Sequence, residues 1–219
     1  MERPAMRQTP LSASKLGMDR RWWLLTVPAL WIVAHNAQYI FGIPYMGDPE
    51  VMWATRRRLF GKLHILGSGF AMFCGPLQFL GGLRRHYPAA HRWIGRVYNL
   101  GIAVGGANAF KMAFAASCHP LGQIGFAVLA GIWLATCALG LLAVLQGDVE
   151  AHKHWMIRNY AATYAAVTLR VQMPVLMASG MLPYHAAAVA GWTSWIPNLV
   201  AAEWWITNRS LARKKLKSK

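Results

Sequence analysis

The sequence predicts an all-α protein: a polytopic transmembrane helical bundle of about six spans with both termini in the cytoplasm. Three observations carry this prediction. First, 56% of the 219 residues are apolar and only 14% are charged, about half the charged share of a soluble domain. Second, the apolar residues gather in runs of about twenty, the length at which a helix crosses a bilayer. Third, the formal net charge of +16 comes from basic residues at the ends of these runs, where charge orients membrane proteins.

The composition also excludes several classes of protein. The high apolar content excludes a disordered or collagen-like chain. The three cysteines, Cys74, Cys118 and Cys137, lie in or at the end of apolar runs and form no Cys-x-x-Cys motif, so they are expected to be small buried hydrophobes. No basic stretch is interleaved with a readable aromatic motif, so the expected partner is the lipid bilayer and not nucleic acid.

The elements follow in order from the N-terminus. Residues 1–21 are polar and basic, and the apolar run after them is too long for a signal peptide; we therefore expect a cytoplasmic tail followed by a retained first span. Residues 22–206 form the six-span bundle, and residues 207–219 form a second basic cytoplasmic tail. The predicted spans are 22–44, 60–82, 94–117, 122–145, 155–178 and 185–206.

The orientation follows from the distribution of Lys and Arg. The N-terminal tail holds five, the connection after the second span four, the connection after the fourth two, and the C-terminal tail six; the third and fifth connections hold none. Basic loops stay in the cytoplasm, which places both termini there. The run Arg56–Arg58 falls on the outer side in this topology, so residues 49–60 are expected to form an amphipathic helix on the outer surface.

Two further patterns concern packing. Spans two and three carry stripes of small residues that include Gly67, Gly101 and Gly105; such stripes let helix backbones approach closely, and they also suit the flat face of a cofactor. The motif Trp93-x-x-Arg96-x-Tyr98 recurs as Trp155-x-x-Arg158-x-Tyr160. Both copies open a span on the cytoplasmic side, which indicates either shared interface anchors or an ancestral duplication.

Charged groups inside a bilayer are costly and therefore point to function. Lys111 and Arg170 lie about sixteen residues into their spans, or about 24 Å along the helix, which places both in the outer half with His64. No acidic residue lies in a span interior; Glu203 is near an inner end. Either the two cations extend to the outer head groups, or they bind an anionic ligand such as haem propionates, a quinone or a lipid phosphate.

A second group of histidines lies at the inner side and comprises His86, His91, His152 and His154. His91 and His154 occupy equivalent ends of parallel spans, so their rings could converge, and Gly95 leaves room beside His91 on the same helical face. Helical bundles hold haem between histidines of neighbouring helices. The metal ligands expected on this basis are His64, His91 and His154. Met72, Met112 and Met156 could instead supply a copper site, or fill gaps in the core.

Five stretches of the chain resemble the bacterial membrane-protein family catalogued as domain of unknown function 2306. They are Gly75-Pro76-Leu77-Gln78-Phe79, His91-Arg92-Trp93-Ile94-Gly95-Arg96-Val97-Tyr98, Gly125-Phe126 with Trp133-Leu134-Ala135-Thr136, Gly147-Asp148 with His152–Arg158, and Ala165–Arg170. The resemblance covers about residues 60–175. It implies an integral helical protein of the inner membrane and brings forward His64, His91, His152 and Arg170. A more distant likeness is to transmembrane b-type cytochromes.

These observations lead to one main functional hypothesis and two alternatives. The main hypothesis is a bundle that binds haem b or a related redox cofactor and passes electrons within the membrane. His64 and His91 would be ligands, with His152 or His154 as partner at the inner site, while Arg170 and Lys111 neutralise propionates or a quinone at the outer site. One alternative is a non-catalytic subunit of a larger membrane complex. The other is a transporter with helices broken at Pro76 and Pro174. No motif for a catalytic nucleophile is present.

Overall fold

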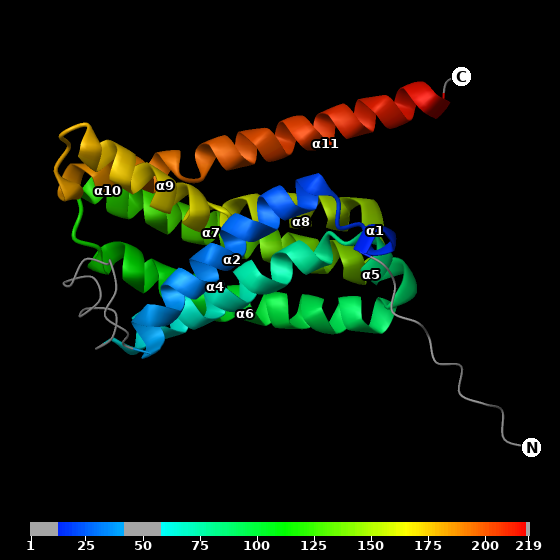
Figure 1. Ribbon diagram of the computed structural model, residues 1–219, viewed down its shortest axis with the longest axis horizontal. Helices are drawn as coiled ribbons and strands as arrows, with labels where there is room; N and C mark the ends of the chain where they lie inside the picture. Colours follow the sequence, from blue (N-terminus) through cyan, green and yellow to red (C-terminus); the bar gives the residue numbers. More distant parts are fainter. Residues whose placement is uncertain (1–12, 42–57, 218–219) are drawn as a thin grey trace, which may run out of the picture.

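The computed structural model describes residues 13–41 and 58–217, which fold into helices joined by short turns (Figure 1). Within these residues there is no strand, so the all-α prediction is confirmed for this part of the chain. Most of the expected outer-surface helix at 49–60 lies outside the described residues; its end, Leu59 and Phe60, forms the start of a bundle helix.

The helices occupy the stretches that the apolar runs predict. Two predicted spans, the fifth and the sixth, each consist of two helices. The bounds are α1 Ala13–Leu16, α2 Arg20–Phe41, α4 Leu59–Gln78, α5 Gly81–His86, α6 Pro88–Ala115, α7 Pro120–Leu145, α8 Val149–Thr163, α9 Ala165–Ala178, α10 Pro183–Thr193 and α11 Ile196–Lys217.

Local chemistry explains where these helices begin and end. Proline stands at the first turn of α6, α7 and α10, where its missing N–H is not needed. The Asp148 side chain caps α8 by accepting a hydrogen bond from the Ala151 N–H at 2.9 Å. Gly147 and Gly180, which follow α7 and α9, adopt positive φ values of 79° and 89°, a conformation that favours glycine.

The helices α4 and α6 pack together through glycines. A Cβ on Gly67 would lie 2.5 Å from both the Gly101 carbonyl oxygen and the Gly105 nitrogen, so the two backbones are in direct contact. This confirms the packing interpretation of the small-residue stripes. Beside this contact, Tyr98, Trp133 and Tyr160 form the buried core that joins α6, α7 and α8.

The repeated Trp-x-x-Arg-x-Tyr motif adopts the same local arrangement in both copies. The Arg96 guanidinium lies 4.5 Å from the Trp93 ring centroid, and that of Arg158 lies 4.7 Å from the Trp155 ring. Tyr98 and Tyr160 are both buried. Each motif therefore pairs a cation with an aromatic ring and directs its tyrosine into the core.

The bundle is apolar on its outside as well as inside. Of the described helices, α7 is the one that is long and apolar enough to cross a membrane. Large apolar side chains are nevertheless exposed on other helices; examples are Leu24 at 63%, Phe70 at 55%, Leu100 at 65% and Val200 at 62%. Helix α1 and the end of α11 lie toward the same end of the bundle (Figure 1).

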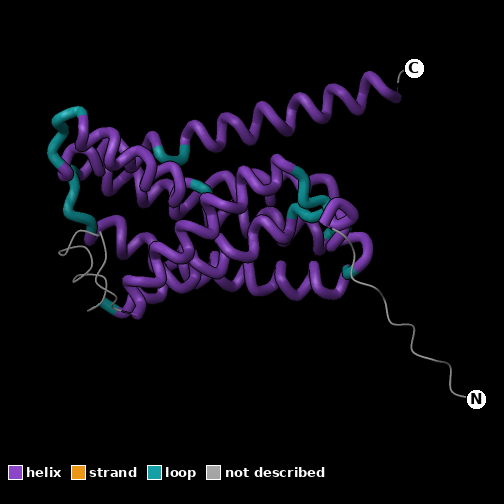
Figure 2. The backbone as a smooth tube through the Cα atoms, viewed as in Figure 1, coloured by secondary structure: helices purple, strands orange, loops and turns teal. Residues whose placement is uncertain are grey.

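Two helical passes are interrupted inside the bundle, as Figure 2 shows. One interruption is at Tyr164, between α8 and α9, and the other is at Ser194 and Trp195, between α10 and α11. The breaks considered at Pro76 and Pro174 do not occur, because both prolines lie within continuous helices. A proline can stay within a membrane helix when neighbouring groups satisfy the freed carbonyl.

Candidate functional site

A cavity of about 320 Å³ lies between α2, α4, α6, α7 and α9, a size at the lower end of small-molecule sites. Its walls are mainly apolar, and a few polar groups converge on it. Both interrupted passes reach it, because Thr163, Ala165 and Ser194 are among its lining residues. The polar side chains that line it are Asn36, Tyr39, His64, Ser68, Thr163, Arg170 and Ser194.

The imidazole of His64 has a fixed orientation at this cavity. Its Nδ1 lies 2.9 Å from the carbonyl oxygen of Gly105 on α6. A carbonyl only accepts hydrogen bonds, so Nδ1 carries the proton and Nε2 of the neutral ring carries the free lone pair. The close glycine contact between α4 and α6 makes this carbonyl accessible to His64. The sequence signal for His64 was its place in an apolar run; the tautomer is set by the helix packing.

Arg170 brings a positive charge to the same cavity. One terminal nitrogen of its guanidinium donates to the Asn36 Oδ1 on α2 at 2.7 Å, and the other donates to the Ala166 carbonyl at 3.0 Å. These bonds use two of the five guanidinium N–H groups. Within the described ranges, no acidic side chain lines the cavity.

The acidic residues of the described ranges are engaged elsewhere. Asp19 and Asp148 accept hydrogen bonds at the starts of α2 and α8. Glu150 contacts Lys153 and His154, and Glu203 forms an ion pair with Arg158. Arg170 therefore has no carboxylate partner among these residues.

A network of satisfied polar groups borders the cavity through Trp133 and Thr163. The Asn159 amide donates to the Trp133 carbonyl at 2.7 Å and to the Thr136 hydroxyl at 2.8 Å, and its Oδ1 accepts from the Tyr98 hydroxyl at 2.6 Å. The Trp133 indole donates to the Thr163 hydroxyl at 2.8 Å. Buried polar groups that are all paired make a rigid support.

Ser194 contrasts with this network. It is 1% exposed, lines the cavity, and its hydroxyl has no hydrogen-bond partner within the described ranges. A buried hydroxyl without a partner is unfavourable and is available to a bound ligand.

The inner histidines form a second, separate group. His152 is held in the same way as His64, because its Nδ1 lies 2.8 Å from the carbonyl oxygen of Gly140 on α7. The buried Nδ1 of His91 has no partner in the described part of the chain. His91 precedes the apolar part of α6; burial lowers its pKa, and the charges of Arg84, His152 and Arg92 lower the pKa further.

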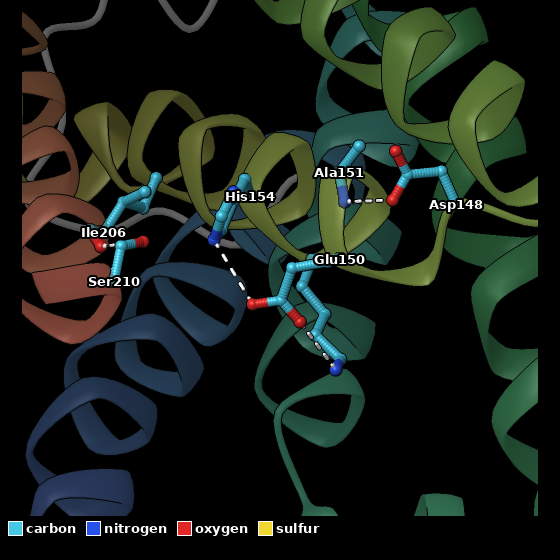
Figure 3. Close-up of polar contacts among 7 residues, drawn as sticks. Asp148, Glu150, Ala151, His154, Ile206 and Ser210 are labelled. Carbon is cyan, nitrogen blue, oxygen red and sulfur yellow. Dashed lines mark hydrogen bonds and ion pairs between the residues drawn. The ribbon is translucent and has the colours of Figure 1, made fainter. Parts of the chain in front are cut away.

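The structure differs from two expectations for this inner group, namely that His154 would face His91 and that Gly95 would leave space beside His91. The Nε2 of His154 lies 3.5 Å from Glu150 Oε1 on the same helix (Figure 3). The space expected beside His91 is taken by Gln78: its Nε2 donates to the His91 carbonyl at 3.3 Å, and a Cβ on Gly95 would lie 3.2 Å from its Oε1. His152 therefore stands closer to the expected role than His154.

Other predicted site residues are not brought together. Lys111 is exposed on α6 and does not line the cavity with Arg170. Gly105, the partner of His64, is fourteen residues after His91 on α6, or about 21 Å along the helix. His64 and His91 therefore belong to separate sites and cannot bind one metal ion. Among the described residues there is no group of three or more His, Cys, Asp or Glu that could hold a metal.

Three polar residues at or beside the cavity were not predicted from the sequence: Asn36, Asn159 and Ser194. Their one signal is a polar residue inside an apolar run, which in a membrane protein marks helix contacts and ligand sites alike. Serine and asparagine are common enough in such runs that this signal does not separate the two.

The described helices form an all-helical bundle with a mostly apolar cavity between them. The chain belongs to the family of predicted membrane proteins designated domain of unknown function 2306, DUF2306, whose family model matches residues 61–206. This confirms the family resemblance and extends it beyond residue 175. No curated protein and no solved structure matches the chain.

Proposed function

We propose that this protein crosses the bacterial inner membrane six times, with both termini in the cytoplasm, and binds haem b or a related redox cofactor through histidines, passing electrons within the membrane. Membership of a family of predicted membrane proteins supports the location. The exposed apolar side chains on the outside of the bundle also support it, since lipid replaces water as the solvent for such a surface.

One observation carries the cofactor proposal: His64 donates its Nδ1–H to the Gly105 carbonyl inside a cavity. Histidines that ligate metals usually donate the other ring nitrogen in this way, which fixes the tautomer and makes the ligating nitrogen more basic. The thioethers of Met72 and Met112 line the same cavity and would be further ligands for the iron, because methionine and histidine both ligate haem. Haem, when bound, supplies the one-electron couple.

The inner group supports a second site of the same kind. His152 has the same anchored geometry as His64, and His91 is the neighbouring imidazole. The two anchored histidines bond to different helices, His64 to Gly105 on α6 and His152 to Gly140 on α7, so two cofactors would mark two points on a path for electrons within the membrane.

An absorption spectrum of the detergent-solubilised protein, oxidised and then reduced with dithionite, tests the proposal. The expected result is a Soret band that shifts on reduction, because the change from ferric to ferrous iron alters the absorption of the porphyrin. The band should weaken in His64→Ala and in His152→Ala, because each change removes a ligand of one proposed site, and it should be lost when both histidines are replaced. It should persist in the control His185→Ala, because His185 is exposed on α10.

A folded, colourless preparation without iron, even after supply of haem during expression, contradicts the redox proposal. If that preparation retains another chain in mild detergent, the protein is a non-catalytic subunit of a larger membrane complex. Helix α11 favours this second function: its C-terminal half leaves the bundle (Figure 1), and Trp204, Leu211 and Leu216 are exposed along it.

A further inference from the structure

The strongest unexplained feature of the cavity is a positive charge that no acidic side chain of the described residues neutralises. The Arg170 guanidinium faces a space with apolar walls, and no carboxylate of the described residues lies on that space. A partly buried cation without a counter-charge is unfavourable, and a paired anion that accepts hydrogen bonds from it removes this cost.

We propose that this cavity binds the carboxylate of an amphiphilic ligand, with Arg170 as the anchoring cation. The inference goes beyond haem binding, because it concerns the charge of the ligand's head group and does not require iron. The same chemistry can come from a haem propionate or from a free amphiphile such as a fatty acid.

The hydrogen bonds of Arg170 support a planar anion. Asn36 and the Ala166 carbonyl each accept from one terminal nitrogen, which fixes the plane of the guanidinium while other N–H groups stay available. Guanidinium and carboxylate form two parallel hydrogen bonds when their planes align. The single positive charge also matches a single negative charge.

The remainder of the cavity supports an apolar body on the ligand and a second polar contact. Ile32, Met112, Phe126 and Leu129 contribute apolar walls. The Ser194 hydroxyl, buried without a partner on the same cavity, is an additional donor for a ligand oxygen. The fixed guanidinium and the hydroxyl without a partner are independent features, and both can donate a hydrogen bond to a ligand oxygen.

Binding of radiolabelled palmitate to the full-length protein in phosphatidylcholine nanodiscs tests the inference, with binding to protein-free nanodiscs subtracted. The expected result is specific palmitate binding for which hexadecanol and hexadecyl phosphate compete poorly. Arg170→Gln should weaken the binding on the order of 30-fold or more, and Arg170→Lys should retain part of it. Arg209→Gln, which removes an exposed arginine that lies over Trp205 on α11, is the matched control and should bind as the unchanged protein does.

The haem arm of the experiment separates the two sources. The protein is titrated with haem and with haem dimethyl ester, and binding is followed at the Soret band. If a propionate occupies the site, the ester should bind more weakly than haem to the unchanged protein. The ester and haem should then bind equally well to Arg170→Gln. Palmitate binding that depends on Arg170, without any haem binding, would leave the inference standing while the redox proposal fails.

Three results would overturn the inference. The first is equal palmitate binding by Arg170→Gln and Arg209→Gln. The second is hexadecanol competing as well as palmitate does in the unchanged protein, a comparison that does not depend on any variant folding. The third is tighter binding of hexadecyl phosphate, which would assign the site to phosphate.

Discussion

Gly67 and Gly69 stand two residues apart on α4 and show how strongly position decides the role of a glycine. A Cβ at Gly67 would meet the backbone of α6 at 2.5 Å, whereas a Cβ at Gly69 would meet nothing within 4 Å. Gly67→Ala should therefore lower the free energy of unfolding by about 1–3 kcal/mol, because backbone atoms must shift. Gly69→Ala should change it by less than about 0.5 kcal/mol. Thermal unfolding in detergent checks both variants, and equal unfolding temperatures would refute the close packing of α4 on α6.

At the same scale, the sequence identified candidate site residues more successfully than it predicted which of them lie together in the fold. His64 and Arg170 stood out because charged and titratable groups are rare in apolar runs, and the structure places both on one cavity. Lys111 has the same sequence signal but projects from an exposed face of α6. The rotation of a helix about its axis separates the two cases. For helices that face lipid on one side and protein on the other, both faces are apolar, so the sequence pattern does not report that rotation.

At the scale of elements, side chains donate hydrogen bonds to the backbone carbonyls at the two helix interruptions. The last turn of α8 leaves carbonyls without helical partners. The amide nitrogen of Asn198 lies 3.3 Å from the Ala161 carbonyl, 3.1 Å from the Ser194 carbonyl and 3.0 Å from the Thr168 hydroxyl. Trp195 and Gln172 donate to two further carbonyls in the last turn of α10. Asn198 therefore joins both interruptions.

Replacing Asn198 should destabilise the bundle where the interruptions meet. Asn198→Leu removes the amide donor and leaves buried carbonyls unpaired, which should lower the free energy of unfolding by about 1–3 kcal/mol. Asn208→Leu, at an exposed position on the same helix, should have little effect. The unfolding temperatures of the two variants in the same detergent measure the difference. An Asn198 variant as stable as the Asn208 variant would show that water or lipid satisfies these carbonyls instead.

The interruptions themselves were not predictable from the sequence. Proline was the available signal for a break, yet Pro76 and Pro174 lie inside continuous helices. The breaks fall at Tyr164 and at Ser194 with Trp195, residues with no strong bias against helix. Tertiary partners such as Asn198 decide these positions. The predicted span limits, by contrast, agree with the helices to within a few residues at most ends, because long apolar runs bounded by Pro and Gly are strong local signals.

At the scale of the whole molecule, the proposed topology places the tail after α11 and the turn between α9 and α10 on opposite sides of the membrane. Green fluorescent protein fused after Lys219 should fluoresce, and alkaline phosphatase fused there should be inactive, because both reporters would stay in the cytoplasm. Alkaline phosphatase inserted after Gly180 should be active. If alkaline phosphatase fused after Lys219 were active, the C-terminus would lie outside the cytoplasm. The topology would then be inverted or have a different number of spans, and the six-span arrangement would be refuted.

The long helix α11 begins at the break beside Ser194, a residue that lines the cavity, and continues without interruption to Lys217. Its 22 residues form a rod about 33 Å long. A tilt of about 10° at its base moves the far tip by about 6 Å for such a rod. Because α11 is one uninterrupted rod, a change of tilt at the end near the cavity would be enlarged at its basic tip. A fluorophore attached at that tip would register filling of the interior from outside the bundle.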